Sequence, residues 1–290
     1  MTPASGSFTN DVRILECRTR AGSHLGLVVK FMVDQPEYAS RCATAQFRAL
    51  ALARAHGVPA PEPIFLDETG KVLGVPGVVT RFVEGRQVAN PQDPMEWAEA
   101  FAQMLLRVHD IRPSDRDRTD LFDTAQQVRF SSQEEPHLLS GGHPLSANIL
   151  QAVRELQPAV AEVKPVLVHM DYWQGNVLWH EGRISAVVDW YFGAYGDPAI
   201  DVAYFRMNLY LRGIKEAADV FLRSYEEGLG KVVQNLGFRE LCAAAQPLPH
   251  PVLWIPASRE MGDPGATDER ATTDYYEFVS EALRHAYAGR

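Results

Sequence analysis

The stretch that decides the fold of this 290-residue chain reads HMDYWQGN at residues 169–176, and VVDW follows at residues 187–190. The first piece has the form His-x-Asp, with an Asn five residues after Asp171. The second places another carboxylate, Asp189, at the end of an apolar run. Phosphoryl transfer needs one carboxylate to orient and deprotonate an acceptor hydroxyl. It also needs an amide oxygen and a second carboxylate to hold Mg2+ against nucleotide phosphates.

The spacing of apolar residues indicates how these side chains meet. Two apolar runs, 177–179 and 184–188, flank a Gly-containing turn, which predicts a hairpin. The hairpin returns the chain so that Asp189 lies beside Asn176, while a buried strand just before the motif delivers Asp171 into the same loop. Three converging oxygen-bearing side chains suit a hard cation such as Mg2+. The alternative is a loop of ordinary polar residues, since a short motif can match by chance.

These pieces, together with GDPAIDVA at residues 196–203, resemble the aminoglycoside phosphotransferase and choline kinase-like family. In that family a His, a variable residue and an Asp precede an Asn, and the metal-binding strand ends in Asp followed by Trp. The resemblance implies an α+β, two-lobed protein-kinase-like fold. A small β-rich N-lobe would span residues 1–83 and bind the nucleotide. A larger, mainly helical C-lobe, residues 84–290, would carry catalysis and acceptor binding.

The resemblance also implies an activity: an ATP- and Mg2+-dependent kinase that transfers the γ-phosphoryl group to a hydroxyl of a small-molecule acceptor. Asp171 would accept the hydroxyl proton or orient the hydroxyl. Asn176 and Asp189 would bind Mg2+, and His169 would brace the loop through hydrogen bonds. The rival hypothesis is a catalytically silent nucleotide-binding or regulatory protein on the same fold. A protein kinase is disfavoured, because no A-P-E-like segment follows Asp189.

A lysine stands alone in an apolar strand, LVVKFMV at residues 27–33. Burying Lys30 is costly unless it meets an anion. The run resembles the V-A-I-K strand whose Lys pairs with nucleotide phosphates. The alternative is an edge-strand lysine that points to solvent.

Four further residues enter the nucleotide site by resemblance. Ser7 lies in the turn SGSFTN, which would cover the phosphates with backbone N–H groups, although a disordered start fits it equally well. Phe82 and Val83 lie at the hinge between lobes, where backbone groups would bind adenine; a plain linker would occupy the same residues. Gln46 stands where the family has a Glu that pairs with the strand lysine. Its amide oxygen would accept a hydrogen bond from Lys30 without supplying charge.

Periodicity and turn formers predict the remaining elements. His109, Asp197 and Asp201 are interpreted as structural, and the apolar stripe from Trp97 to Val108 as core. Residues 131–144 are expected to form an exposed loop, and residues 246–274, rich in Pro, Gly and Asp, another loop. Helices are expected at residues 37–56, 93–108, 146–156, 202–211, 217–229 and 275–287.

Composition bounds the remaining possibilities. The net charge of -9 argues against nucleic acid as a partner. It is compatible with a cationic substrate, although acidic proteins commonly use charge for solubility. No run is long enough to span a membrane, and the start lacks the features of a signal peptide. Three widely spaced cysteines indicate neither a disulfide framework nor a zinc site, so a cytoplasmic, reducing location is expected.

Overall fold

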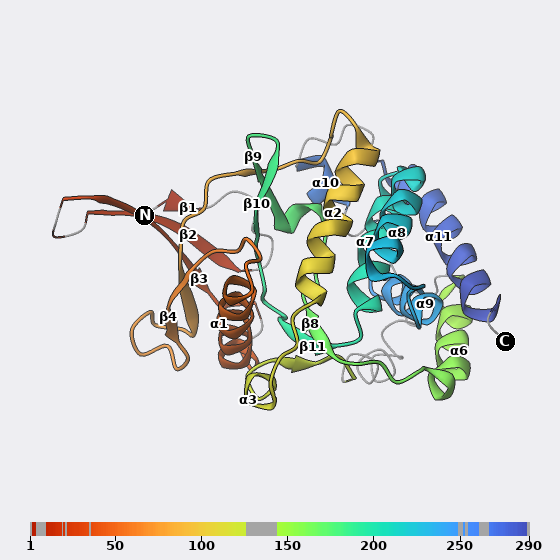
Figure 1. Cartoon of the computed structure of the whole chain (residues 1–290), viewed down its shortest axis with the longest axis horizontal. Coiled ribbons are helices and arrows are strands. Elements are labelled where there is room, and N and C mark those ends of the chain that lie inside the picture. Colours follow the sequence, from red (N-terminus) through yellow and green to blue (C-terminus); the bar gives the residue numbers. More distant parts are fainter. Residues whose placement is uncertain are drawn as a thin grey trace. The chain divides into compact units, whose positions relative to one another are not determined.

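The computed structural model (Figure 1) shows an α+β protein whose strands are concentrated toward the N-terminus and whose helices dominate the C-terminal part. The residues it describes are 2–3, 10–18, 20, 22–34, 36–125, 144–248, 252, 255–260 and 267–288. The chain divides into two compact units. The first unit comprises Met1–Val88, Ile111–Phe122 and His169–Tyr195, and the second comprises Ala89–Asp110, Asp123–Val168 and Gly196–Arg290.

The strands of the described residues are short to medium in length. They are β1 (Thr2–Pro3), β2 (Asp11–Arg18), β3 (His24–Phe31), β4 (Pro63–Asp67), β5 (Gly77–Arg81), β6 (Arg86–Gln87), β7 (Phe122–Asp123), β8 (Val166–Val168), β9 (Val177–His180), β10 (Arg183–Val187) and β11 (Ala194–Gly196). The α-helices are α1 (Ala39–Ala55), α2 (Pro94–His109), α3 (Asp115–Arg118), α6 (Ser146–Leu156), α7 (Ala199–Leu211), α8 (Lys215–Leu229), α9 (Leu236–Ala245), α10 (Ile255–Glu260) and α11 (Asp268–Ala288).

The first unit is built on an antiparallel sheet with the strand order β1-β2-β3-β5-β4. β3 lies inside this sheet, where Lys30 is paired with Val12 on one side and with Val78 on the other. β-branched residues make up the middle of β5 and also occur in β3 as Val28 and Val29, and such residues pack well on a pleated surface. Lys30 is therefore on a central strand, and the edge-strand alternative is wrong.

Helix α1 packs against β4 and β5 of this sheet. Its sequence is rich in alanine, the strongest helix former, and its buried face is made of small residues around Cys42. The helix begins two residues later than predicted and is followed by Gly57, whose φ of 76° is left-handed. Glycine adopts that conformation without steric cost, so the predicted stop at this residue is confirmed.

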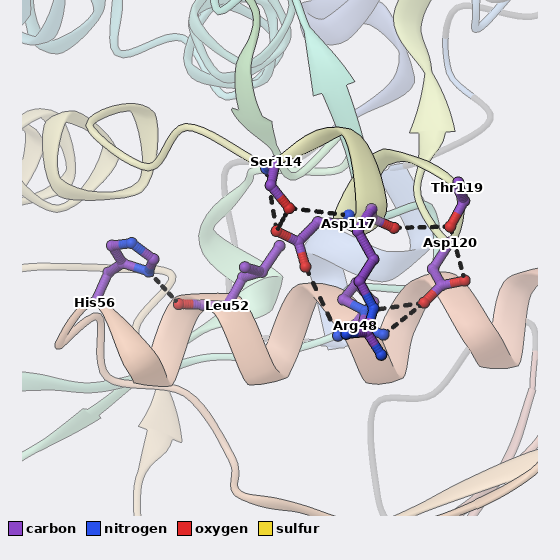
Figure 2. Close-up of polar contacts among 8 residues, drawn as sticks. Arg48, Leu52, His56, Ser114, Asp117, Thr119 and Asp120 are labelled. Carbon is purple, nitrogen blue, oxygen red and sulfur yellow. Dashed lines mark hydrogen bonds and ion pairs between the residues drawn. The ribbon is translucent and has the colours of Figure 1, made fainter.

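The outer face of α1 is tied to the segment of residues 114–121 (Figure 2). Arg48 Nη2 lies 2.7 Å from Asp120 Oδ2, and Arg48 Nη1 lies 3.7 Å from Asp117 Oδ1. Arg41, two helical turns earlier on the same face, donates to two backbone carbonyls of that segment. Asp117 also completes a capping box with Ser114 at the start of α3.

A second sheet of the first unit has the order β10-β9-β6. β9 and β10 form the predicted hairpin, which turns at Glu181 and Gly182 with φ values of 49° and 77°. Two consecutive left-handed residues match the twist of an antiparallel pair. The Val187 N–H donates to the Pro59 carbonyl at 2.8 Å, which fixes the end of the hairpin beside the exit of α1.

The second unit is helical, and aromatic rings fill its core. Asp93 caps α2 by accepting from two backbone N–H groups, with Pro94 at the first helical position. The predicted apolar stripe of α2 is buried, as expected for core. Phe101 stacks on Phe205 of α7 with ring centroids 4.6 Å apart. Helix α6 has the predicted bounds, and α7 and α8 extend the predicted ranges by a few residues at their N-terminal ends.

The expectation that residues 246–274 form a loop is wrong in part. α10 occupies Ile255–Glu260, and α11 begins at Asp268, seven residues before the predicted start at Tyr275. Asp268 and Glu269 in the first turn of α11 complement the positive end of the helix dipole. Ala271 is fully buried and anchors this turn. The start of α11 cannot be predicted from composition alone, because charged and small residues are also common in loops.

Two polar clusters in the second unit confirm the structural roles predicted for His109, Asp197 and Asp201. The buried imidazole of His109 contacts Asp201 Oδ2 at 3.1 Å and the Tyr225 hydroxyl at 2.6 Å. Asp197 Oδ1 accepts from the backbone N–H of residue 199 at the start of α7, and Asp197 Oδ2 accepts from Arg239 Nε at 2.8 Å. These bonds tie α7 to α2, α8 and α9.

A buried ion pair lies deeper among the same helices. Arg206 of α7 is 1% exposed, and its Nε donates to Glu240 Oε1 of α9 at 2.8 Å. Arg206 Nη1 also donates to the Ala218 carbonyl of α8 at 3.0 Å. The second Glu240 oxygen lies 2.8 Å from His285 Nδ1 of α11. One carboxylate thus joins three helices.

The compact units do not follow the predicted boundary between residues 83 and 84. Residues 169–195 group with the N-terminal sheet, where Asp189 pairs with Lys30 of β3 and the Val187 N–H donates to the Pro59 carbonyl just after α1. The lobe boundary itself stays a prediction. Among the described residues, no helix is long and apolar enough to cross a membrane. The loop predicted at residues 131–144 lies outside the described residues except for Pro144.

Candidate active site

The loop after β8 is organised by one histidine. Met170 has a left-handed φ of 72°, a strained conformation for this residue type that turns the chain after His169. His169 is fully buried, its Nε2 is 2.9 Å from the Val188 carbonyl, and its Nδ1 accepts from the Asp171 N–H at 3.3 Å. The proton therefore resides on Nε2, which donates to Val188. His169 braces the loop against the residue before Asp189, as the sequence predicted.

Asn176 connects the two ends of the motif. Its Nδ2 donates to the Asp171 carbonyl at 2.9 Å and to Asp171 Oδ2 at 2.8 Å. With the amide nitrogen engaged in this way, the Asn176 Oδ1 is the atom suited to meet a cation. The Val188 N–H donates to the Asn176 carbonyl at 2.8 Å, so Asp189 follows directly beside Asn176. The structure thus brings Asp171, Asn176 and Asp189 together.

Asp189 forms an ion pair with Lys30. The Lys30 side chain is 8% exposed and that of Asp189 is 36% exposed, so the ammonium is buried while the carboxylate still faces solvent. Burial acts to raise the pKa of Asp189, but the charge and hydrogen bond of Lys30 outweigh it and hold that pKa below its ordinary value. Asp189 also has a left-handed φ of 60°. Such strained residues cluster at functional sites.

Sequence reasoning missed a further neighbour of Lys30. The Nζ of Lys30 lies 4.9 Å from the centroid of the Tyr191 ring, within the range of a cation–π interaction. Tyr191 is buried, and burial raises the pKa of its phenol, so the ring stays neutral. The available signal was an aromatic residue two positions after Asp189.

The hydrogen bond predicted between Lys30 and Gln46 is wrong. Gln46 lies on α1 and is 5% exposed, and its Oε1 has no hydrogen-bond partner within the described part of the chain. Lys30 donates instead to Asp189. An ionised acceptor binds an ammonium more strongly than a neutral amide does, so the carboxylate wins the competition. A role for Gln46 in nucleotide binding stays a proposal.

The predicted hinge follows β5. The Phe82 N–H donates to the Gly26 carbonyl of β3 at 3.0 Å. This N–H is therefore engaged in the sheet, which leaves the Phe82 carbonyl as the backbone group of this residue suited to contact a base. Val83 lies in the irregular segment between β5 and β6. Its role in adenine binding stays a prediction. Ser7 lies outside the described residues.

A second residue that sequence reasoning missed is Gln87 of β6, whose Nε2 donates to the Gly175 carbonyl at 2.7 Å. The contact depends on the pairing of β6 with β9, which cannot be predicted from a local sequence pattern. Gly175 itself is confined, because a Cβ there would lie 2.3 Å from the Trp173 ring. The loop is thus held from both sides.

Solved structures with a similar architecture identify the fold. A choline kinase, LicA from Streptococcus pneumoniae, matches with a TM-score of 0.60 and 15% identity, covering 98% of this chain and 92% of that one. An aminoglycoside-3'-phosphotransferase of type VIII matches with a TM-score of 0.56 and 20% identity, covering 83% of this chain and 90% of that one. These likenesses confirm the protein-kinase-like fold.

The sequence identifies the family. Residues 1–234 match the model of the Phosphotransferase enzyme family, and the chain belongs to that family. Homoserine kinase of Bartonella henselae is 27% identical over 153 residues, which is 51% of this chain and 47% of that protein. Hygromycin-B 4-O-kinase of Escherichia coli is 41% identical over 61 residues, covering 20% and 18% of the two chains. The chain therefore spans about half, or less, of the length of these curated relatives.

Proposed function

We propose that this protein is a kinase that transfers the γ-phosphoryl group of ATP to a hydroxyl group of a small molecule. The observation that carries the proposal is the joining of two sequence-distant groups: Lys30 of β3 reaches the carboxylate of Asp189, and Asp189 stands beside Asn176 and Asp171. A phosphate-binding cation, two metal-binding oxygens and a proton acceptor are the parts that phosphoryl transfer uses.

Asp171 is the residue placed to handle the hydroxyl proton. Its carboxylate is partly exposed, and one oxygen accepts from Asn176 while the backbone N–H donates to His169. These contacts fix the loop at both ends of the residue. Under the proposed function, the Asp171 carboxylate would accept a hydrogen bond from an acceptor hydroxyl and take its proton as the phosphoryl group is transferred.

The donor set fits magnesium. Asn176 contributes an amide oxygen and Asp189 a carboxylate, and Mg2+ in phosphoryl-transfer sites is commonly held by one or two such side chains plus substrate phosphates. When bound, the ion would neutralise charge on the transferred phosphoryl group. Lys30 would move from Asp189 toward the phosphates. The Asp189 carboxylate is already ionised, because Lys30 holds its pKa low.

The acceptor class follows from the relatives by analogy. Homoserine kinase, Hygromycin-B 4-O-kinase and choline kinase LicA are named for small hydroxyl-bearing acceptors, and another fold neighbour is a GDP and kanamycin complex of APH(2")-IIia. We therefore place the acceptor among small alcohols of the amino-alcohol, amino-acid or aminoglycoside type. Both ATP and GTP belong in the test, because that neighbour holds a guanine nucleotide.

The test of this function is nucleotide consumption with candidate acceptors, followed by mass spectrometry of the product. We expect the wild-type protein to convert one acceptor with a gain of one phosphoryl group, and to require Mg2+. Nucleotide binding without transfer to any acceptor of the panel would favour the silent, regulatory alternative. Absence of nucleotide binding would overturn both readings.

Asp189→Ala should weaken binding of Mg-ATP by tenfold or more, on the order of 1.4 kcal/mol, because the variant removes a metal ligand and leaves Lys30 without its carboxylate. Titration calorimetry with and without Mg2+ measures the effect. Asp67→Ala is unsuitable as a control, since Asp67 accepts from three backbone N–H groups. Asp115→Ala is suitable, because that side chain is fully exposed and forms only a distant pair within its own helix. Unchanged Mg-ATP affinity in Asp189→Ala would argue against the metal site.

A further inference from the structure

The charge of Lys30 has two neighbours in the described structure, one ionic and one aromatic. The carboxylate of Asp189 pairs with the ammonium, and the ring of Tyr191 lies 4.9 Å from the same atom. Both neighbours come from one short stretch of chain, since Tyr191 is two residues after Asp189. The lysine is thereby held against that stretch.

The α1 residues that pack against Tyr191 in the described structure have no ionised side chain. Tyr191 belongs to a buried cluster with Met32, Cys42 and Val78, and Phe47 packs on its margin. Gln46, on the same helix, is neutral and does not hydrogen-bond to Lys30 through its Oε1. Burial raises the pKa of the Cys42 thiol, which keeps that group neutral as well. The face of an aromatic ring is the electron-rich surface that this side offers to the ammonium.

The single carboxylate has two tasks under the proposed function. Asp189 compensates Lys30 in the structure, and it would bind Mg2+ in the reaction. When the Asp189 carboxylate binds Mg2+, its ion pair with Lys30 would weaken. Lys30 then needs a second support that stays in place, and the Tyr191 ring is positioned to give it.

We propose that Tyr191 is a positioning residue for Lys30, whose ring face takes over the task that the family pattern gives to a carboxylate at the position of Gln46. The inference rests on the proposed function. It predicts that the π face matters and that the hydroxyl does not. A cation–π contact that is partly desolvated changes affinity by about twofold to thirtyfold.

The test compares three variants by titration of Mg-ATP and by steady-state kinetics. Tyr191→Phe keeps the ring, and we expect its dissociation constant to stay within about twofold of wild type. Tyr191→Leu keeps an apolar side chain and removes the ring, and we expect about tenfold weaker nucleotide binding. The KM for ATP should rise while kcat at saturating ATP changes much less. Phe47→Leu is the matched control, because it removes a ring from the same cluster without touching Lys30.

A rescue variant separates this role from simple packing. Gln46→Glu in the Tyr191→Leu background restores a charged partner on α1, and we expect it to recover most of the lost affinity. Gln46→Glu alone should preserve or modestly raise the affinity for ATP. A packing defect would not respond to the added charge. If Tyr191→Leu does not fold, Tyr191→Met, which fills the same space flexibly, replaces it in the comparison.

The outcomes distinguish this inference from the proposed function. Wild-type affinity in folded Tyr191→Leu, or an equal loss in Phe47→Leu, would overturn the role of Tyr191 and leave the kinase assignment standing. A wild-type protein that binds no nucleotide would overturn the proposed function, and this inference with it.

Discussion

Asp171→Ala should lower turnover by about 10²- to 10⁴-fold, the usual contribution of a positioned proton acceptor, while Mg-ATP affinity stays close to wild type. The separation follows from the geometry. Asp171 is bound to Asn176 and His169, whereas Lys30 pairs with Asp189. Rates with the accepted substrate and calorimetric titration of Mg-ATP measure the two quantities independently.

The fold should tolerate this change. Asn176 keeps its hydrogen bond to the backbone carbonyl of residue 171, and His169 keeps the backbone N–H of the same residue. Asp171→Asn retains the shape and loses the proton acceptor, so it should be nearly as inactive as the alanine variant. Turnover comparable to wild type in either folded variant would remove Asp171 from the chemistry and contradict the proposed mechanism.

Glu240→Ala should destabilise the protein by about 3 kcal/mol, because it leaves the guanidinium of Arg206 buried without its carboxylate. Both side chains are almost fully buried, at 1% and 0% exposure. Asp219 Oδ1, 3.6 Å from Arg206 Nη1, and the Ala218 carbonyl compensate only in part. Denaturant unfolding monitored by circular dichroism measures the change in the free energy of unfolding.

The double variant Arg206→Leu with Glu240→Leu is the matched comparison. Removing both charges avoids an unpaired buried ion, so its stability should lie well above that of Glu240→Ala. A Glu240→Ala protein as stable as wild type would show that the pair does not hold the helices together.

The loss of stability caused by Glu240→Ala should depend on pH. The hydrogen bond to Glu240, together with its charge, raises the pKa of His285 above the ordinary value of 6.5. A raised folded-state pKa gives stability that is complete below the unfolded value and is lost as pH rises through the folded value. The stability gap between wild type and Glu240→Ala should therefore be wider near about pH 6 than near about pH 9.

The sequence predicted those parts of the site that local chemistry dictates. The hairpin could be inferred because two apolar runs flank a Gly-containing turn, and its geometry carries Asp189 to Asn176. Lys30 could be inferred because a lone charge in an apolar strand needs an anion. The structural role of His109 was inferred from the resemblance, because this histidine lies in a Leu-x-x-x-His pattern that is common at this place in the family.

The parts that sequence reasoning missed depend on tertiary contacts. Gln46 was assigned to Lys30 by counting along the chain, but the competition with Asp189 is decided in space. Tyr191 and Gln87 act through a ring face and a strand pairing, neither of which leaves a periodic signal. The first turn of α11 was missed because acidic residues that favour a helix start also occur in loops.

The polar contacts on the outer face of α1 bear on control of the enzyme. In protein kinases the position of the corresponding helix is a point of regulation. Here Arg41 and Arg48 bind one short segment, residues 114–121, from positions two helical turns apart. Displacing α1 would break the contacts of both guanidinium groups together. Under the proposed function, these two arginines would therefore oppose a movement of α1 away from residues 114–121.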